Sequence, residues 1–545
     1  MRLRSLLLTT VLFALSSARP HAAGAFTAPA LVKDVNVGAG DSAPVVFYPI
    51  AGKLVFFASD GVSGTEPWTS DGTAAGTFQL RDVWPGANGG FNPGCPSCNA
   101  VSNGTIVYFS ASDGTGGSQL WRTDGTSAGT IKVYAGTVAS GLGVVGSRVF
   151  FTSGTGQLYV SDGTSAGTVA ASSNTYATGT DIADVGGIAY YSGSDGFSGN
   201  ELFRSDGTQG GTFRVKDLNP DSNDANPTYF TNVGGTLYFS ATNGTGGGLY
   251  KTDGTSAGTI LLRQGTITGG AVGSRPQFLP VNGIVYFIGS DNTFGQELWR
   301  TDGTPAGTFM VKDVYPGAGG GLVGSALCAV GNTIFFMGAD DTHSAELWKS
   351  DGTAAGTVMV KDIAPGISSS FPRALANING TLFFRAQASF AAGDQPWTSD
   401  GTAAGTQQWA AIRPADASGA RDFTLAGGTL YFAANDGTHG LELWAAGPTL
   451  GVAPGQGPST LSLAQSQPNP MRAQAAITYA IAVGQHVTLK LFDAQGREVQ
   501  TLVDQMQTAG LHRAYLDSRG LASGLYFYRL RAGSEVRERK LVIQN

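Results

Sequence analysis

Short apolar runs rich in β-branched and aromatic residues recur along most of the chain. In one stretch, "TVMVKDI" (357–363) alternates, "FPRALANI" (371–378) follows a Pro-Gly signal, and "TLFFRA" (381–386) is apolar on both faces. A period of two favours half-buried strands, and a short continuous apolar run favours an interior strand. "NG" at 379–380 predicts a hairpin turn. With "QPWTS" (395–399), the stretch predicts four antiparallel strands.

The same arrangement recurs nine times along the chain. Four strands in about 45–50 residues are typical of a propeller blade, so we predict an all-β fold with a β-propeller of about nine units. An aromatic residue marks each unit at Trp68, Trp121, Tyr159, Phe203, Tyr250, Trp299, Trp348, Trp397 and Trp444. An apolar phrase precedes each aromatic residue, at 53–58, 105–111, 148–153, 188–193, 236–241, 284–289, 334–339, 381–386 and 429–434.

The two ends of the array complement each other. "LVKDV" (31–35) has no "ELW" before it, and the last "ELW" (442–444) has no "VKD" after it. We therefore predict that the N-terminal strand completes the last blade and closes the ring. Propellers usually have about four to eight blades, so an open superhelix or an unpaired unit stays an alternative. Pro67 and Pro396, which cannot donate to a ladder, predict an edge strand or an unpaired slot.

The best-kept phrase, "ELWKSDGTAAGTVMVKDI" (346–363), has two interpretations. The first is architectural: the last strand of one blade, a glycine turn, and the first strand of the next. The second makes its aromatic residue part of a carbohydrate-stacking platform. Aromatic side chains at fixed blade positions more often pack between sheets, where each buries a large apolar area, so the core position is favoured.

An aspartate opens the "DGT" turn in eight units. Such a side chain bonds nearby backbone N–H groups and precedes a glycine at positive φ, which gives it a structural role. Calcium binding is the weaker alternative, because calcium takes about six to eight oxygens and each turn supplies one carboxylate. No other cofactor is predicted. The aspartates are Asp71, Asp124, Asp162, Asp206, Asp253, Asp302, Asp351 and Asp400.

The N-terminus and the charge balance point to an exported protein. Residues 1–25 combine Arg2 and Arg4 with an apolar run (6–15) and "AGA" (23–25), which predicts a secretory signal peptide. No later apolar run approaches the ~20 residues of a membrane helix, so no transmembrane segment is expected. The net charge is −6, with the acidic excess in the middle of the chain. That balance argues against nucleic-acid binding, which needs a basic face.

Catalytic signatures are missing from the sequence. The five histidines are scattered, and no H-E-x-x-H, G-x-S-x-G or P-loop motif occurs. We therefore predict no catalytic residues. Cys95 and Cys98, in "CPSC", lie in a Gly/Pro-rich loop, and a local disulfide in an oxidising compartment is the prediction for them.

The character of the chain changes after a Gly/Pro-rich linker at 447–465. Residues 466–545 contain six or seven strand-like segments with hairpin signals such as "AQG" and "RAG". About 80 residues of this kind predict a small β-sandwich.

Two resemblances follow from these phrases. "ELWRTDGT" (297–304) and "ELWKSDGT" (346–353) resemble the ELWxxDGT repeat of secreted and surface bacterial proteins, and the likeness extends over about 31–444. "QPNPM" (467–471), "LFDAQGREVQTLVD" (491–504) and "LASGLYFYRL" (521–530) resemble the C-terminal sorting domain of type IX secretion substrates, close to the FlgD-type Ig-like module. The glutamate of the repeat motif is replaced in four units, by Gln119, Gln157, Gln395 and Gly248.

These resemblances imply a signal peptide (1–25), a repeat propeller (26–446), a linker (447–465) and a sorting module (466–545). The implied partner is the outer-membrane secretion machinery, and the implied location is the medium or the cell surface. We expect a non-enzymatic protein that binds or adheres to an extracellular glycan or protein through its propeller loops. An extracellular polysaccharide hydrolase or lyase on the same scaffold is the alternative.

Overall fold

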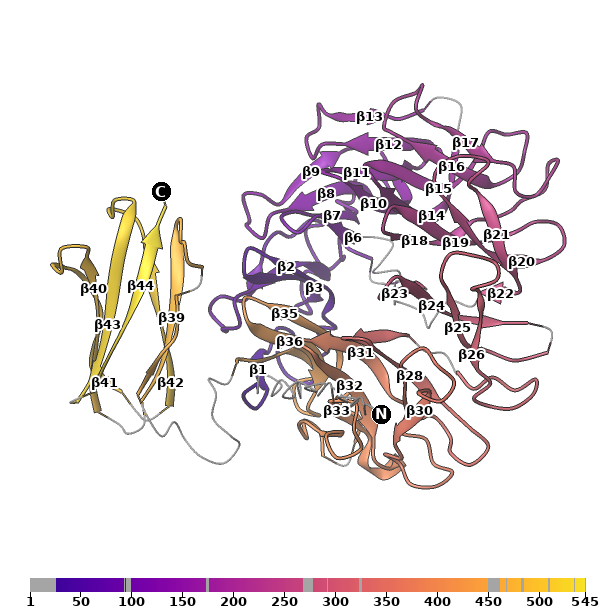
Figure 1. The fold of residues 1–545 in the computed structure, drawn as a ribbon. Coiled ribbons are helices and arrows are strands. Elements are labelled where there is room, and N and C mark those ends of the chain that lie inside the picture. Colours follow the sequence, from indigo (N-terminus) through magenta and orange to yellow (C-terminus); the bar gives the residue numbers. More distant parts are fainter. Residues whose placement is uncertain are drawn as a thin grey trace, which may run out of the picture. The chain divides into compact units, whose positions relative to one another are not determined.

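The computed structural model divides into two compact units, Met1–Gly447 and Pro448–Asn545, and the division falls at the start of the predicted linker. Strands make up 53% of the chain. In the described part of the chain the only helix is one 3-10 turn, η1 (Phe390–Ala392), and no helix is long and apolar enough to cross a membrane (Figure 1). The structure describes residues 26–92, 94, 100–172, 176–267, 278–291, 293–322, 326–414, 416–448, 461–466, 468–481, 485–507, 510–533 and 535–544. The predicted signal peptide and Cys95 and Cys98 lie outside these residues.

The described residues of the first unit form nine small antiparallel sheets, numbered here in chain order. Sheets 1 to 4 contain β2 (Val45–Ile50), β3 (Lys53–Ser59), β4 (Thr65–Ser70) and β5 (Phe78–Gln79); β6 (Ala100–Ser102), β7 (Val107–Ala111), β8 (Gln119–Thr123) and β9 (Ile131–Tyr134); β10 (Val138–Val145), β11 (Arg148–Ser153), β12 (Leu158–Ser161) and β13 (Thr168–Ala170); and β14 (Tyr176–Val185), β15 (Ile188–Ser194), β16 (Glu201–Ser205) and β17 (Phe213–Lys216).

The other five sheets follow the same order of strands, and sheet 6 has one extra short strand, β22. Sheets 5 to 9 contain β18 (Thr228–Val233), β19 (Thr236–Thr242), β20 (Gly247–Thr252) and β21 (Ile260–Gln264); β22 (Thr266–Ile267), β23 (Phe278–Val281), β24 (Ile284–Ser290), β25 (Glu297–Thr301) and β26 (Phe309–Lys312); β27 (Cys328–Val330), β28 (Thr333–Gly338), β29 (Glu346–Ser350) and β30 (Val358–Lys361); β31 (Arg373–Ile378), β32 (Thr381–Gln387), β33 (Asp394–Ser399) and β34 (Gln407–Gln408); and β35 (Arg421–Ala426), β36 (Thr429–Asn435), β37 (Leu441–Ala446) and β1 (Ala30–Lys33).

The predicted grouping of strands is wrong in one respect. β30, which carries "VMVK", pairs with β29 of the same sheet through Leu347↔Lys361 and Trp348↔Met359. The phrase 346–363 is therefore a hairpin within one sheet, and the crossover to the next sheet comes after β30. The physical reason is the "DGT" turn, which is short enough to fold the chain straight back against the strand that precedes it.

The two prolines also correct an expectation. Pro67 and Pro396 lie in third strands, which have a neighbour on each side, so the edge-strand alternative is wrong. At the equivalent residue of sheet 6, Leu298 pairs with Lys312, and the register then shifts by one residue. The fourth strands beside the prolines, β5 and β34, contain two residues, whereas β26 contains four. A proline N cannot donate to the ladder, and the fourth strand stops at this position.

The pairing predicted for the chain ends is present. β1 pairs antiparallel with β37 through Ala30↔Ala445 and Leu31↔Trp444. An apolar cluster then joins this sheet to sheet 1, with Tyr431 and Phe56 among its members. The described residues contain one such cluster between every sheet and the next, so the series of clusters returns to the sheet where it began.

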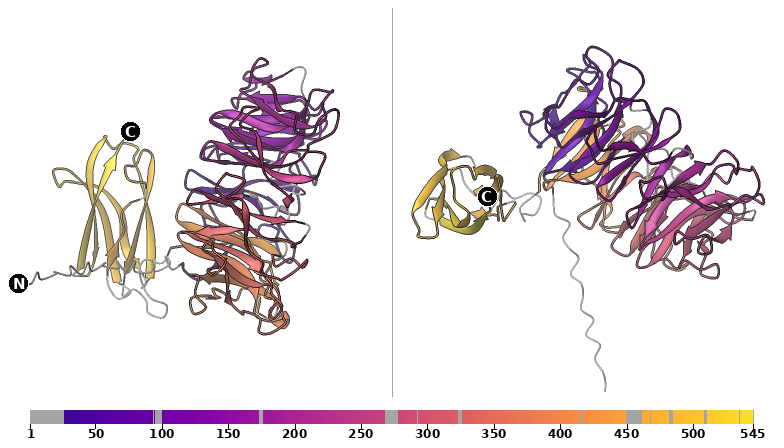
Figure 2. Two further views of the ribbon diagram at one scale, coloured as in Figure 1. Left: turned by 45° about the vertical axis from the view of Figure 1, so that its right-hand side comes forward. Right: turned by 90° about the horizontal axis from the view of Figure 1, so that it is seen from above.

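The second unit consists of two antiparallel sheets around one apolar cluster, as predicted for the C-terminal module. Its strands are long and lie side by side (Figure 2). In β40, Val487, Leu489 and Leu491 are buried and alternate with more exposed residues, which places one face of the sheet on the core. The strands are β38 (Ser462–Leu463), β39 (Gln474–Ile481) and β42 (Gly510–Asp517) in one sheet, and β41 (Glu498–Gln507), β40 (Gln485–Asp493), β43 (Gly524–Ala532) and β44 (Glu535–Ile543) in the other.

Candidate functional site

Two kinds of loop lie at the same end of every sheet in the first unit. One joins the second and third strands, and the other crosses from the fourth strand to the first strand of the next sheet. Because neighbouring strands are antiparallel, both kinds fall on one face, which we call the loop face, and the "DGT" turns fall on the opposite face. Backbone hydrogen bonds tie the two loops of a sheet together, as from Ser370 N to Ala345 O (3.0 Å). The main loop-face segments are 34–44, 60–64, 80–92, 195–200, 217–227, 313–322, 339–345, 362–372, 388–393, 409–414 and 436–440.

A fully buried glutamate holds the crossover in five of the sheets. Glu346, at the start of β29, accepts hydrogen bonds from Ile363 N (2.8 Å), Ala364 N (3.2 Å), Ser370 N (3.1 Å) and Ser370 Oγ (2.6 Å). Backbone N–H groups of the crossover thus find an acceptor inside the fold, as buried donors must. The equivalent glutamates, all without exposed surface, are Glu66, Glu201, Glu297 and Glu442.

Glu442 has the same role at the junction of the chain ends. Its carboxylate accepts from Val35 N (3.1 Å), Asn36 N (3.2 Å) and Ser42 Oγ (2.7 Å), which belong to the segment after β1. The N-terminal segment therefore supplies both the fourth strand of sheet 9 and the crossover that its glutamate holds.

Burial raises the pKa of these carboxyl groups against the opposing effect of their hydrogen bonds. The pKa of Glu66 and of Glu201 rises to about 7, and the pKa values of Glu297, Glu346 and Glu442 are raised as well. Gln395 shows that the position also works without charge. Its Oε1 accepts from Ile412 N (2.9 Å), and its Nε2 donates to Arg413 O (2.8 Å). Hydrogen bonding to the crossover, not charge, is the shared property.

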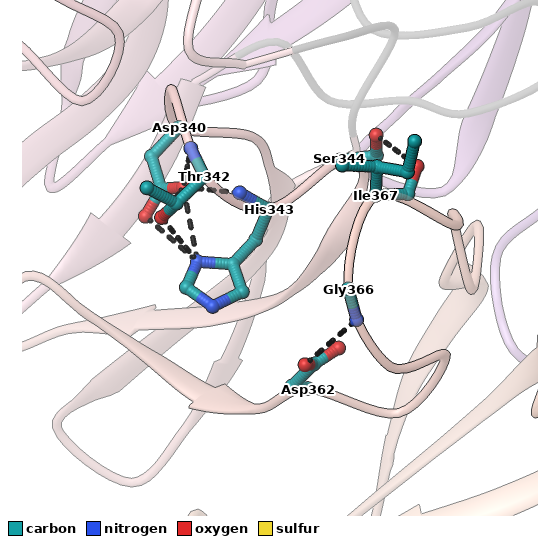
Figure 3. Close-up of polar contacts among 7 residues, drawn as sticks. All are labelled: Asp340, Thr342, His343, Ser344, Asp362, Gly366 and Ile367. Atoms are coloured by element: carbon teal, nitrogen blue, oxygen red, sulfur yellow. Dashed lines mark hydrogen bonds and ion pairs between the residues drawn. The ribbon is translucent and has the colours of Figure 1, made fainter.

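In seven of the nine sheets the loop between the second and third strands is an Asx turn. In the loop of sheet 7, Asp340 Oδ1 accepts from Thr342 N (2.9 Å) and His343 N (2.6 Å), and His343 Nδ1 lies 3.0 Å from the same oxygen (Figure 3). Ser344 Oγ donates to Ile367 O (2.7 Å), which joins this loop to the crossover. The hydroxyl of Ser344 is thus turned to the crossover and not to the imidazole.

His439 repeats this arrangement with Asp436, at 2.7 Å, and that hydrogen bond raises the pKa of His439. Ser63 and Ser198 occupy the same turn position in other sheets and bond to their aspartates in the same way. His343 and His439 lie in sheets 7 and 9, which are not neighbours. Among the described residues, no second histidine is therefore brought to either pair, and the His–Asp pairs belong to the turns.

The most exposed apolar side chains of the first unit stand on the loop face. Among the described residues of this unit, every large apolar side chain that is more than about 60% exposed lies there. No large apolar side chain described elsewhere in this unit is more than 50% exposed. Sequence reasoning missed these residues, although an apolar residue inside a polar turn such as "DGFSG" is a readable signal. They are Val37 (84%), Val62 (72%), Phe197 (86%), Ile367 (89%) and Phe390 (93%).

The aspartates of the "DGT" turns lie on the opposite face and have local partners. Asp351 Oδ1 accepts from Thr353 N (2.9 Å) and Thr353 Oγ1 (2.7 Å), and these bonds lower its pKa. Gly356 packs so closely that a Cβ there would lie 2.1 Å from Asp351 Oδ1. The same bonds recur at Asp71, Asp124, Asp162, Asp206, Asp253, Asp302 and Asp400. Within the described residues, no group of three or more His, Cys, Asp and Glu side chains could hold a metal ion.

The tryptophans of the repeat are buried, as predicted. Trp397 is 6% exposed, and Lys361 of the preceding sheet lies with its Nζ 5.8 Å from the ring centroid. The same ammonium group donates to Thr406 O (2.8 Å). The lysine of "VKD" thus joins adjacent sheets, and Lys33 repeats the contact to Thr77 O (2.9 Å) across the junction of the chain ends.

Comparison with solved structures finds proteins of low similarity. A computationally designed protein, Ika8, has a TM-score of 0.38 and 13% identity, and the alignment covers 76% of this chain and 99% of that one. Puromycin hydrolase has a TM-score of 0.34 and 14% identity, with 67% and 61% covered. PorZ of Porphyromonas gingivalis, a surface component of the type IX secretion system, has a TM-score of 0.24 and 12% identity, with 96% and 99% covered. These likenesses carry no argument about function.

The C-terminal unit gives a specific match. No curated protein matches the chain in sequence. Residues 467–544 match the family model described as "Secretion system C-terminal sorting domain". This range contains β39 to β44, and the predicted sorting phrases at 491–504 and 521–530 fall inside it. The sorting domain of type IX secretion marks the protein as secreted and attached to the cell surface.

Proposed function

We propose that the protein is a non-enzymatic binding or adhesion protein of the bacterial surface, which holds an extracellular ligand on the loop face of its first unit. Its C-terminal module delivers it through the outer-membrane secretion machinery. The ligand class is a glycan or a protein, and binding needs no cofactor. The sorting domain supports the destination, and the loop face supports the activity.

The proposed scaffold is a nine-bladed β-propeller of the ELWxxDGT type, closed by β1. The pairing of β1 with β37 and the crossover bonds of Glu442 support closure. The apolar cluster between sheets 9 and 1 supports it too. A ring of this kind presents many loops on one broad face, which suits recognition of an extended partner.

One observation carries the proposal: the exposed apolar side chains of the loop face stand on turns that are held rigidly. Asp195 Oδ1 accepts from Phe197 N (3.0 Å), and Ser198 Oγ donates to the same oxygen (2.8 Å). Phe390 begins η1, whose cap Ser389 Oγ accepts from Ala392 N (3.2 Å). An exposed aromatic side chain on a backbone turn that is already ordered loses less entropy on binding than one on an unordered loop, so it is suited to contact a partner.

The enzymatic alternative finds less support. A hydrolase or lyase needs acids or a histidine that converge on one pocket. The buried glutamates accept backbone hydrogen bonds, and the two His–Asp pairs lie in separate sheets.

The test is binding of the mature protein to a glycan array and to immobilised extracellular polysaccharides and proteins. We expect at least one ligand, and we expect Phe197→Ser with Phe390→Ser to weaken its binding about tenfold or more. The matched control is Phe213→Ser with Phe309→Ser. These rings are each 45% exposed and lie on fourth strands, away from the loop face. Equal losses in both double variants, or turnover of a polysaccharide, would contradict the proposal.

A further inference from the structure

Three arginines meet at the loop-face end of sheets 8 and 9. Arg373 is the first residue of β31, Arg421 is the first residue of β35, and Arg385 is near the end of β32. β31 and β32 both contact β35, and Figure 1 shows the three strands side by side. Residues 372 and 416–420 of the two crossovers directly precede Arg373 and Arg421, so these arginines lie at the loop-face ends of their strands.

The arrangement places like charges opposite each other. Arg373 and Arg385 are direct cross-strand partners, a pairing that destabilises a sheet unless the charges are compensated. Compensation is incomplete, because Arg385 reaches Asp394 only at 3.5 Å and Arg421 reaches Asp422 at 3.4 Å. Among the described residues, Arg373 has no carboxylate as an ion-pair partner.

The charges of this cluster act on one another across the two sheets. Burial lowers the pKa of Arg385, Asp394 and Asp422 raise it, and Arg373 and Arg421 lower it further. Three guanidinium groups thus face two carboxylates. This leaves a local excess of positive charge, although the middle of the chain is acidic as a whole. An excess of positive charge of this kind is stabilised when an anion joins it.

An exposed aromatic ring flanks the free guanidinium. Arg373 Cζ lies 5.5 Å from the ring centroid of Phe371, and this ring is 43% exposed. Phe371 has positive φ (48°), a backbone conformation that a bulky residue adopts at a strain. A guanidinium fork matches a carboxylate in two parallel hydrogen bonds, and an adjacent aromatic face suits the C–H face of a sugar ring.

We propose that Arg373, Arg385, Arg421 and Phe371 form an anion-binding subsite for the carboxylate of an acidic polysaccharide. Arg373 provides the free fork, Arg385 and Arg421 provide the surrounding positive potential, and Phe371 contacts the sugar ring. The assignment rests on the proposed binding role of the loop face and names the ligand class for it.

The test measures binding of the full chain to immobilised polygalacturonate, with free polygalacturonate, dextran, heparin and poly-L-glutamate as competitors. We expect Arg373→Gln to weaken polygalacturonate binding about tenfold, since it removes a charge-assisted bidentate contact. Lys53→Gln is the matched control, because it removes the same charge from an exposed residue beside the β2–β3 hairpin on the opposite face. It should leave binding unchanged.

A second variant tests the site by gain of affinity. Asp422 has positive φ (61°), which asparagine accepts readily, so Asp422→Asn removes a competing carboxylate and keeps the backbone. We expect binding to strengthen about threefold or more. Together with the loss in Arg373→Gln, this result would support the subsite, whereas weaker binding of Asp422→Asn would contradict it.

Three results would overturn the assignment: no binding of polygalacturonate, equal losses in Arg373→Gln and Lys53→Gln, or stronger competition by heparin or poly-L-glutamate than by free polygalacturonate. The proposed function fails separately. If another ligand binds and needs Phe197 and Phe390, the binding role stands without the anion subsite.

Discussion

Replacing Glu346 by alanine tests the role of the buried glutamates in holding the loop face. Ser370 N and Ser370 Oγ have a second acceptor in Ala345 O, at 3.0 and 3.3 Å. Ile363 N and Ala364 N depend on the carboxylate alone. An unpaired buried donor costs about 1–3 kcal/mol, and water that enters the space left by the side chain offsets part of this. We expect a loss of about 3 kcal/mol, confined largely to the crossover 362–372.

Hydrogen exchange measured peptide by peptide is the suitable assay. A local loss of about 3 kcal/mol should speed exchange of amides in 362–372 by roughly 100-fold, while peptides from β28 and β29 stay protected. Glu346→Gln is the control, because in sheet 8 Gln395 Oε1 accepts from Ile412 N and Arg413 N, the counterparts of the two donors that depend on Glu346, and it should change stability by less than about 1 kcal/mol. If the alanine and glutamine variants exchange alike, the crossover does not depend on this side chain, and the reasoning is refuted.

Three further predictions concern pH, closure and calcium. Burial raises the pKa of Glu66 from 4.5 to about 7, so its contribution to stability is full below pH 4.5 and is lost as pH rises through 7. In denaturant titrations, the free energy of unfolding should therefore fall by about 3 kcal/mol between pH 4.5 and pH 8 through this group, and Glu66→Gln should remove that fall. Deleting residues 26–42 removes β1 and the donors to Glu442, and should abolish the cooperative melting of the first unit by circular dichroism, whereas an unchanged melt would refute closure. Calcium and chelator should give the same melting temperature within about 1 °C, because Asp351 and its equivalents have local partners; a large calcium-dependent rise would restore the metal alternative.

The sequence predicted the strands well because their signals are local. "TLFFRA" (381–386) comes directly after an Asn-Gly turn signal, and β32 (Thr381–Gln387) matches its range within one residue. The complementary chain ends predicted the pairing of β1 with β37, since an unfinished sheet needs a fourth strand. Buried Trp397 also follows from size and spacing alone.

Other features depend on contacts that no local pattern contains. The sheet boundary was misplaced because a strand's pattern is the same whether it pairs with the preceding or the following strand. The repeated "E" of "ELW" gave no hint that Glu346 accepts from Ile363 N and Ser370 N, which are 17 and 24 residues away. The arginine subsite needs Arg421 beside Arg373, and only the packing of sheets 8 and 9 brings these residues together.

The most direct test of the account is hydroxyl-radical footprinting of the mature protein, alone and with a saturating ligand from the binding panel. The method reports the solvent access of side chains such as Phe197, Phe390 and Ile367, which are 86%, 93% and 89% exposed in the free protein. A ligand held on the loop face should protect these residues and leave the reactivity of Phe213 and Phe309 unchanged. Protection confined to the fourth strands or to the "DGT" face would contradict it.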